Sequence, residues 1–431
     1  MGGHGVVIGG SIAGLLAARA LANHLDRVTL IERDIYPASV APRKGVPQGH
    51  HIHVIWSGGR RAIDSLLPGC FDELIARGGI EFDNSADMRW FQYGVWKLRI
   101  DSGFRMVSQT RPLLEDVIRR RVAQDERIAV RCAAASGLLL DGERVRGVRT
   151  SAGDVEADLV VDASGRGSQL PAWLGTHGYA PPPVSEVTLD LGYATRFYDV
   201  PPPNGRDWHV MAVYPKPPET HRIGVIFPVE GARWIVTAVG SFGDYPAADD
   251  AGFMGFLDGL DRPEFAQAVR EAVPVGPIVT MRHPSQQRRY YERMRRRPAN
   301  LVVIGDSLCT FTPIFGQGVS VAALEAVALD RALATTDLAR VADTYFAAAK
   351  RIVDGPWMLA TMMDLLYPAV RGRRPPGTRA LQWYLRRVLA LTGEHEGVYR
   401  RFLDVVHMTA PVQTLFHPTV IGAVLAPTRR S

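Results

Sequence analysis

Apolar residues near the start of the chain come in short uninterrupted runs. Gly5–Ile8 and Val28–Glu32 are two such runs, and the stretch Ile12–Asn23 between them is apolar and rich in small residues. Continuous short runs are typical of strands buried in a parallel sheet, and a small-residue stretch of that length predicts a helix packed closely against them. The chain therefore opens with a predicted strand–helix–strand unit.

The same buried-strand signal returns at Leu159–Val161 and at Leu301–Ile304, far along the chain. Thr110–Gln124 has the pattern of a helix. Arg222–Pro228 and Arg233–Val239 instead alternate apolar and polar residues, which predicts an antiparallel sheet with one covered face. We therefore expect a parallel-sheet domain assembled from separated segments, with the antiparallel sheet inserted between them.

The last part of the chain is expected to be largely helical. A helix is predicted from Gly318 to about Thr335, and further helices follow from Asp337. Because proline removes a backbone donor and clashes with the preceding turn, we expect these helices to break at each proline site. The predicted breaks are at Pro356, Pro368, Pro375–Pro376 and Pro411.

Composition excludes several classes of protein. The 431 residues, 46% hydrophobic and 22% charged, suit a globular protein of two or three packed domains. The net charge of +6 comes without a nucleic-acid recognition motif, so we expect no nucleic-acid partner. No uncharged apolar run is long enough to span a bilayer. Three scattered cysteines without a CxxC pair are typical of the reducing cytoplasm.

The first chemical motif is Gly9-Gly10-Ser11-Ile12-Ala13-Gly14, at the turn between the first strand and the helix. A dinucleotide fingerprint has glycine at the first, third and sixth places, and here Ser11 replaces the second of those glycines. The helix N-terminus would offer free N–H groups to a diphosphate. Glu32 ends the next strand, where a carboxylate can accept hydrogen bonds from ribose hydroxyls. Arg33 follows it as a further candidate cofactor contact.

The second motif follows the late buried strand. It begins with Gly305-Asp306 and continues with Pro313-Ile314-Phe315-Gly316-Gln317-Gly318, which leads into a helix. A carboxylate after a buried strand can hold a ribityl hydroxyl. Glycines at a helix start let backbone N–H groups face a flavin pyrimidine, where the helix dipole would stabilise negative charge on the reduced ring.

Together these motifs resemble the class A flavoprotein monooxygenases, the para-hydroxybenzoate hydroxylase fold. The resemblance implies that Arg111 lies near an FAD diphosphate. The run Arg43–His53 is similar to the flavin-proximal loop of a subfamily that includes polyether-ionophore epoxidases, which makes Arg43 and Lys44 further candidate FAD contacts. Most hydroxylases of this family have Asp where Ser164 stands, a departure that bears on how NADPH is used.

The expected fold class is α/β (α+β overall), with a Rossmann-like FAD-binding domain, an inserted antiparallel-sheet substrate domain and C-terminal helices. The expected limits are residues 1–85, 105–180 and 276–340 for the discontinuous FAD-binding domain, 86–104 and 181–275 for the substrate domain, and 341–431 for the C-terminal helical region.

The resemblance implies an FAD-dependent monooxygenase that uses a C4a-hydroperoxyflavin, with NAD(P)H as reductant and O2 as co-substrate. No residue stands out as a general base, which favours epoxidation of an apolar natural product over hydroxylation of a phenol. Tyr193 and Arg196 are candidate substrate contacts, or residues that only pack and pair on the sheet. His50, His51 and His53 lack a neighbouring carboxylate or cysteine, so we expect no metal site.

Two other functions stay open. One is a non-redox cyclase that keeps FAD as a structural element, and the other is an aromatic hydroxylase. A flavin halogenase is disfavoured because the Trp-x-Trp-x-Ile-Pro run expected of that family is absent. The sequence carries no signal for an oligomeric state.

Overall fold

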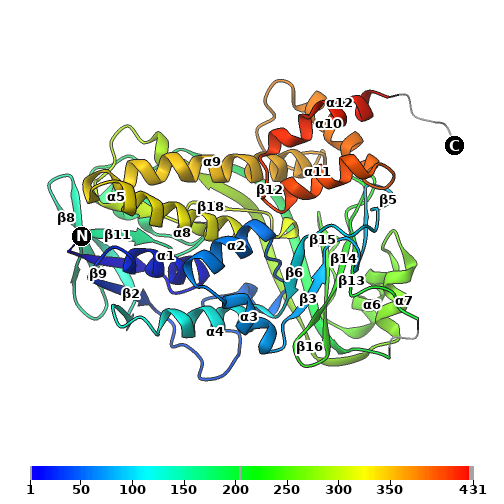
Figure 1. Ribbon diagram of the computed structural model, residues 1–431, viewed down its shortest axis with the longest axis horizontal. Helices are drawn as coiled ribbons and strands as arrows, with labels where there is room; N and C mark the ends of the chain where they lie inside the picture. Colours follow the sequence, from blue (N-terminus) through cyan, green and yellow to red (C-terminus); the bar gives the residue numbers. More distant parts are fainter. Residues whose placement is uncertain (1, 203–204, 427–431) are drawn as a thin grey trace.

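The computed structural model describes residues 2–202 and 205–426 and has two large sheets, a three-stranded and a two-stranded sheet, and helices around them (Figure 1). A five-stranded sheet has the order β17-β11-β1-β2-β7, and all its strands run parallel. Neighbours in this sheet come from distant parts of the chain, as the sequence predicted. Its strands are β1 His4–Ile8, β2 Arg27–Glu32, β7 Ile128–Cys132, β11 Leu159–Asp162 and β17 Leu301–Val303.

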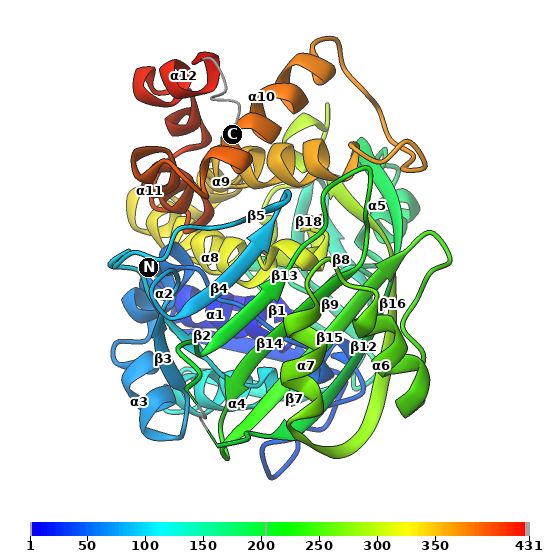
Figure 2. The same cartoon turned by 90° about the vertical axis from the view of Figure 1, so that its right-hand side faces the viewer.

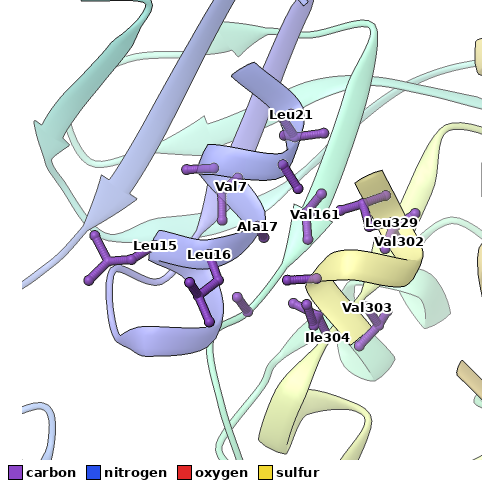
Figure 3. Close-up of a cluster of buried hydrophobic side chains, with 14 of the residues drawn as sticks. Val7, Leu15, Leu16, Ala17, Leu21, Val161, Val302, Val303, Ile304 and Leu329 are labelled. Atoms are coloured by element: carbon purple, nitrogen blue, oxygen red, sulfur yellow. The ribbon is translucent and has the colours of Figure 1, made fainter. Parts of the chain in front are cut away.

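Helix α1, Ile12–Ala22, packs directly on the parallel sheet and beside α8, Gly318–Thr335 (Figure 3). Alanines in α1 allow this close approach, and a Cβ added at Gly5 of β1 would lie 2.8 Å from a methyl carbon of Leu21. The core side chains here are almost fully buried, and each large one contributes about 1.5–3 kcal/mol. The predicted α/β class is confirmed.

Smaller elements surround this sheet. They are β3 Ile80–Asp83, β6 Arg105–Ser108, β8 Ala135–Asp141, β9 Arg144–Thr150, β10 Val155–Glu156, α2 Ser57–Leu66, α3 Cys70–Ala76, α4 Arg111–Val122, α5 Leu170–Thr176 and the short 3-10 helices η1 Pro47–His50, η2 Tyr291–Arg293, η3 Gly305–Ser307 and η4 Pro313–Phe315.

The second sheet has eight strands in the order β18-β16-β12-β15-β14-β13-β4-β5, and it stands at an angle to the first (Figure 2). Its neighbours pair antiparallel except β13 and β4, which are parallel. The strands are β4 Met88–Gln92, β5 Val95–Trp96, β12 Val184–Asp199, β13 Val210–Val213, β14 Ile223–Val229, β15 Arg233–Ser241, β16 Val273–Arg289 and β18 Cys309–Thr310; α6 Asp250–Asp258 and α7 Pro263–Arg270 accompany them.

The expected domain limit at residue 276 falls inside strand β16. This strand pairs with β12 along most of its length, so residues 276–289 belong to the eight-stranded sheet and not to the parallel one. Prolines at 274, 277 and 284 hide the strand in the sequence, because proline weakens a strand signal. The other domain limits stay predictions.

The C-terminal region is helical, but the predicted break at Pro356 is wrong. Helix α9 runs without interruption through Leu338–Asp364. The residue before the proline is Gly355, which has no Cβ to collide with the proline ring. The other three proline sites lie between helices. The remaining elements are α10 Thr378–Leu391, α11 Glu396–Val406, η5 Val412–Phe416 and α12 Pro418–Leu425.

Across residues 2–202 and 205–426, no helix combines the length and the apolar character that a membrane span requires.

Candidate functional site

The first glycine turn is tightly packed backbone. Gly9 has φ of 101°, and a Cβ there would lie 2.5 Å from the carbonyl oxygen of Ala163. A Cβ on Gly14 would collide with the carbonyl oxygen of Gly9. Ser11 is the N-cap of α1, yet its side chain makes no capping hydrogen bond. The first N–H groups of α1 therefore lack side-chain partners, which is the arrangement that binds an anion.

The second glycine turn lies against the first. Gly305 has φ of 65°, and a Cβ on it would lie 2.8 Å from the Cβ of Ala13. Gly316 also has a left-handed conformation, with φ of 62°, and faces Val54. Both positions exclude ordinary side chains. Two turns that are about 300 residues apart in the sequence thus meet in space.

One cavity of about 750 Å³ runs along both turns and continues into an apolar chamber. Most of the predicted cofactor contacts line it: Gly9, Gly10, Ser11, Ile12, Ala13, Glu32, Arg33, Arg43, Arg111, Gly305, Asp306, Pro313, Gly316, Gln317 and Gly318. Gly14 lies behind the turn, where it permits the packing described above. Lys44 is exposed and does not line the cavity.

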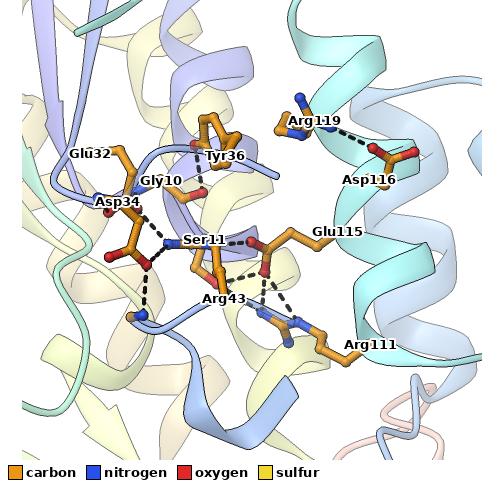
Figure 4. Close-up of polar contacts among 11 residues, drawn as sticks. Gly10, Ser11, Glu32, Asp34, Tyr36, Arg43, Arg111, Glu115, Asp116 and Arg119 are labelled. Atoms are coloured by element: carbon orange, nitrogen blue, oxygen red, sulfur yellow. Dashed lines mark hydrogen bonds and ion pairs between the residues drawn. The ribbon is translucent and has the colours of Figure 1, made fainter. Parts of the chain in front are cut away.

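A buried ionic network borders the first turn (Figure 4). Arg43 contacts Glu32 at 3.1 Å, Asp34 at 2.9 Å and Glu115 at 2.6 Å. Burial alone would lower the pKa of Arg43, but the Glu115 and Glu32 carboxylates raise it above its ordinary value. The Gly10 N–H donates to Glu32 at 2.8 Å, so this carboxylate also holds the turn.

Arg111 completes this network from helix α4. Its guanidinium donates to the Ser11 hydroxyl at 2.8 Å and lies 3.3 Å from Glu115, one helical turn away. Burial lowers the pKa of Arg111, and Glu115 opposes that change. The sequence interpretation missed Asp34 and Glu115; the i,i+4 spacing of Arg111 and Glu115 was the available signal.

A glutamate on α8 supports the second turn. Glu325 is fully buried, and its Oε2 accepts the Gly305 N–H at 2.7 Å. Burial raises the pKa of Glu325 to about 8. Burial likewise raises the pKa of Asp306, which the positive charge of Arg111 opposes. The two turns are therefore braced by carboxyl groups from different elements.

The floor of the chamber is one face of the eight-stranded sheet. Cross-strand pairing aligns Tyr193 with Val239 and Ile223 in one row. A second row contains Thr237, Val225, Ala212 and Trp90. All of these residues line the cavity. Residues two apart in a strand share a face, so the rows follow from the register of the sheet.

Helices and loops cover this floor. The C-terminal region contributes Leu359, Met363, Leu385, Val388, Leu389, Phe402, Val405 and Leu415, and the loop before α2 contributes Val46, His51, Ile52, His53 and Trp56. These lining residues are mostly apolar, so the chamber is suited to an apolar ligand.

The two candidate substrate contacts, Tyr193 and Arg196, lie on opposite faces of strand β12. Tyr193 lines the chamber and is buried, whereas Arg196 points away, pairs with Asp250 at 2.7 Å and donates to the Gly276 carbonyl. Their spacing of three places them on opposite faces of strand β12, so only Tyr193 can reach the cavity.

A few polar atoms interrupt the apolar wall. Tyr193 Oη, His51 Nε2, Trp90 Nε1 and Gln92 Oε1 are buried and have no hydrogen-bond partner among the described residues. The other nitrogen of His51 is 2.7 Å from the Thr195 hydroxyl. Burial lowers the pKa of His51 to about 4, so its imidazole is neutral at pH 7.

The loop that follows β11 is held by hydrogen bonds between its own residues. Ser164 donates from its hydroxyl to Asp162 at 2.5 Å and from its backbone N–H at 2.9 Å. Arg166 donates to the hydroxyl of Ser285 at 2.8 Å. Ser164, which stands where most of the resembling hydroxylases have Asp, therefore has its hydroxyl bonded to Asp162.

Comparisons with known proteins agree on the fold. No protein-family model matches the chain. Protein Rv3254 of Mycobacterium tuberculosis is 29% identical over 422 residues, which cover 89% of each chain.

Three solved structures are similar in shape. The flavin-dependent brominase Bmp2 has a TM-score of 0.68 at 16% identity over 94% of each chain. PqsL of Pseudomonas aeruginosa, in complex with 2-aminobenzoylacetate, has a TM-score of 0.62 at 15% identity. The match covers 94% of this chain and 99% of PqsL. The Diels-Alderase PyrE3 has a TM-score of 0.62 at 18% identity, and the match covers 94% of this chain and 80% of PyrE3.

The chain therefore has a fold shared by flavin-dependent monooxygenases and halogenases, and the predicted monooxygenase fold is confirmed. The names of these structures give no support to the narrower resemblance to polyether epoxidases, which stays a prediction.

Proposed function

We propose that this protein is an FAD-dependent monooxygenase that transfers one oxygen atom from O2 to an apolar organic substrate. The observation that carries the proposal is a single cavity in which two glycine turns meet at one end and an apolar chamber opens at the other. A flavin held at the turns would place its reactive ring at the entrance to that chamber.

The residues at the turns fit FAD. The uncapped N-terminus of α1, with Arg111 beside it, offers N–H groups and positive charge to a diphosphate. The N-terminus of α8, at Gly318, likewise offers N–H groups and the positive end of a helix dipole to the pyrimidine end of the flavin ring. Glycines at 9, 14, 305 and 316 let the turns pack tightly against neighbouring protein atoms that a Cβ would meet, which keeps the turns in the conformation that lines the cavity.

When bound, FAD supplies the oxygen activation, with NAD(P)H as the proposed reductant. The chain's own residues bind and orient the reactants and exclude water. The C-terminal helices and the loop before α2 cover the chamber, so few waters compete for the reactive oxygen. The unpartnered Trp90 and Gln92 groups would orient a neutral polar group of the substrate at the far end.

The titratable groups favour epoxidation over phenol hydroxylation. Burial lowers the pKa of His51 to about 4, of His53 to about 3 and of His283 to about 4. Imidazoles this weak are poor acceptors for a phenolic proton, whereas epoxidising an alkene needs no base. Asp364 has a pKa that burial raises to about 7, but it bonds to Thr312 and Gln286 behind the wall.

A non-redox cyclase that keeps FAD as a structural element is the second candidate. Ser164, bonded to Asp162, favours it, because the resembling hydroxylases use a carboxylate there in their NADPH contacts. Aromatic hydroxylation is the remaining alternative.

The test uses purified full-length protein loaded with FAD, NADPH, isotopically labelled O2 and a probe pair, farnesyl acetate and its fully saturated analogue. We expect NADPH oxidation, and one labelled oxygen atom in the polyene product with none in the saturated ester. A protein that takes up no FAD, or a product that forms equally without O2 and NADPH, would contradict the monooxygenase proposal.

A further inference from the structure

The outer surface of the C-terminal helices exposes an unusual number of large apolar side chains. Ten large hydrophobic residues are exposed in the described residues, and four of them fall after residue 380. We call them the C-terminal apolar patch: Trp383 (52% exposed), Phe416, Ile421 and Leu425 (66% exposed). Scattered single exposures are normal, so the grouping is the informative feature.

Contacts between the helices bring these residues to one surface. Phe416 stacks on Tyr384, the neighbour of Trp383, with ring centroids 4.9 Å apart. Arg387, one turn after Trp383 on α10, donates to carbonyls at the end of α12, beside Leu425. On α12 itself, Ile421 and Leu425 are one turn apart and both exposed, while Val420 and Val424 on the other face are buried.

The segments that carry the patch are rich in arginine and poor in acidic residues. Residues 365–391 contain six arginines and no Asp or Glu, and residues 405–431 also contain neither acid. Arg371, Arg373 and Arg379 are exposed. Arg386 lies 3.6 Å from Glu219, and among the described residues this is the one ion pair that these six arginines make with an acid.

We propose that the C-terminal apolar patch and its arginines bind reversibly to an anionic phospholipid surface. Tryptophan and aliphatic side chains enter the boundary between headgroups and acyl chains, and arginines are attracted by acidic headgroups. A second copy of this chain is a poorer occupant, because a twofold contact would bring two arginine-rich segments together. This proposal does not depend on the oxygenase function.

The patch lies close to the apolar chamber, so membrane binding there would bring the chamber near a lipid surface. In both views, α10 and α12 form the outermost layer above α9 and α11 (Figures 1 and 2). The inner side of α10 and the segment before α12 line the apolar chamber through Leu385, Val388, Leu389 and Leu415. A membrane at this surface would lie one helix layer away from the chamber.

The Arg293–Arg297 run offers an internal control. It is also basic, and Arg295 and Arg296 are exposed, but no large hydrophobic residue of that run is exposed. Charge without apolar anchors is therefore present on the same molecule, and the two surfaces can be compared directly.

The experiment is co-sedimentation of the full-length protein with vesicles of phosphatidylcholine alone and of phosphatidylcholine mixed with phosphatidylglycerol. We expect binding only to the mixed vesicles, and we expect it to weaken with added salt. The double variant Trp383→Ser/Leu425→Ser should bind about tenfold more weakly, and Arg379→Gln about fivefold more weakly. Val273→Ser, at an exposed strand residue, and Arg295→Gln should leave binding unchanged.

Three results would overturn the proposal. The first is no sedimentation with the mixed vesicles. The second is an equal loss of binding in Arg295→Gln and Arg379→Gln, which would show charge attraction without a defined surface. The third is concentration-dependent dimerisation, measured by light scattering, that disappears in the double variant while vesicle binding persists. Far-UV circular dichroism verifies that each variant is folded.

Discussion

The two ends of the cavity are built in different ways. At the cofactor end, backbone atoms fill the space so closely that Gly9, Gly14 and Gly305 accept no side chain, and buried ion pairs fix the surroundings. At the substrate end, side chains from sheet rows and C-terminal helices form the wall, with unpartnered polar atoms among them. One end is therefore specified by backbone geometry, and the other by side chains that can change without loss of the fold.

The largest effect is expected from a single methyl group at the cofactor end. Gly14→Ala would force the turn open against the Gly9 carbonyl and lower the free energy of unfolding by about 3 kcal/mol or more. FAD binding, followed by flavin fluorescence quenching, should be lost. Gly255→Ala is the matched control, since nothing lies near that exposed helical glycine and alanine should stabilise the helix by about 1 kcal/mol. Equal effects of the two substitutions would contradict the comparison.

The next effect concerns the ionic network. Arg43→Gln would leave Glu32, Asp34 and Glu115 together without their shared cation and cost about 3 kcal/mol in chemical denaturation. The control is Arg146→Gln, which breaks an exposed pair with Glu156 and should cost less than about 1 kcal/mol. If both cost the same, the network would not be a structural element of the cofactor end.

Glu325 predicts a pH dependence at the second turn. Its folded-state pKa of about 8 lies above that of the unfolded chain, so its contribution to stability is complete below pH 4.5 and is lost as pH rises toward 8. Glu325→Gln retains an acceptor for the Gly305 N–H. The variant should remove a slope of up to about 1.4 kcal/mol per pH unit in this window. Urea unfolding at several pH values measures the slope of the unfolding free energy against pH. Parallel plots for the wild-type protein and Glu325→Gln would refute the prediction.

The smallest effect is expected at the substrate end. The Tyr193 hydroxyl has no partner among the described residues, so Tyr193→Phe should change the unfolding free energy by less than about 0.5 kcal/mol. Tyr345 donates to the Val303 carbonyl at 2.9 Å beneath the parallel sheet, so Tyr345→Phe should cost about 1 kcal/mol. Thermal unfolding compares the two, and a larger cost at Tyr193 would show that the chamber is as rigidly specified as the core.

The same contrast explains what could be predicted from the sequence. The βαβ unit and both glycine turns are local patterns, so their residues could be identified without coordinates. Arg43 and Arg111 were identified by resemblance, but their partners Asp34 and Glu115 were not, because an ion pair depends on which elements meet. The outward direction of Arg196 was predictable from its spacing of three from Tyr193.

The chamber was harder to predict. Its rows depend on the register of strands as distant in sequence as β4 and β12, and its cover comes from helices near the end of the chain. Strand β16 was missed because its prolines disguise it, and α9 was divided at Pro356 because Gly355 was not taken into account. Tertiary pairing decided the chamber rows and strand β16, whereas the continuity of α9 rests on the local Gly355-Pro356 pair.

The most direct test of the central claim is an experimental structure of the protein with FAD. We expect the diphosphate at the backbone N–H groups of Ser11–Ala13, the flavin ring against Gly316–Gly318, and the apolar chamber open beyond it. A flavin bound elsewhere on the chain, or side chains that close the space between the two turns, would contradict the account.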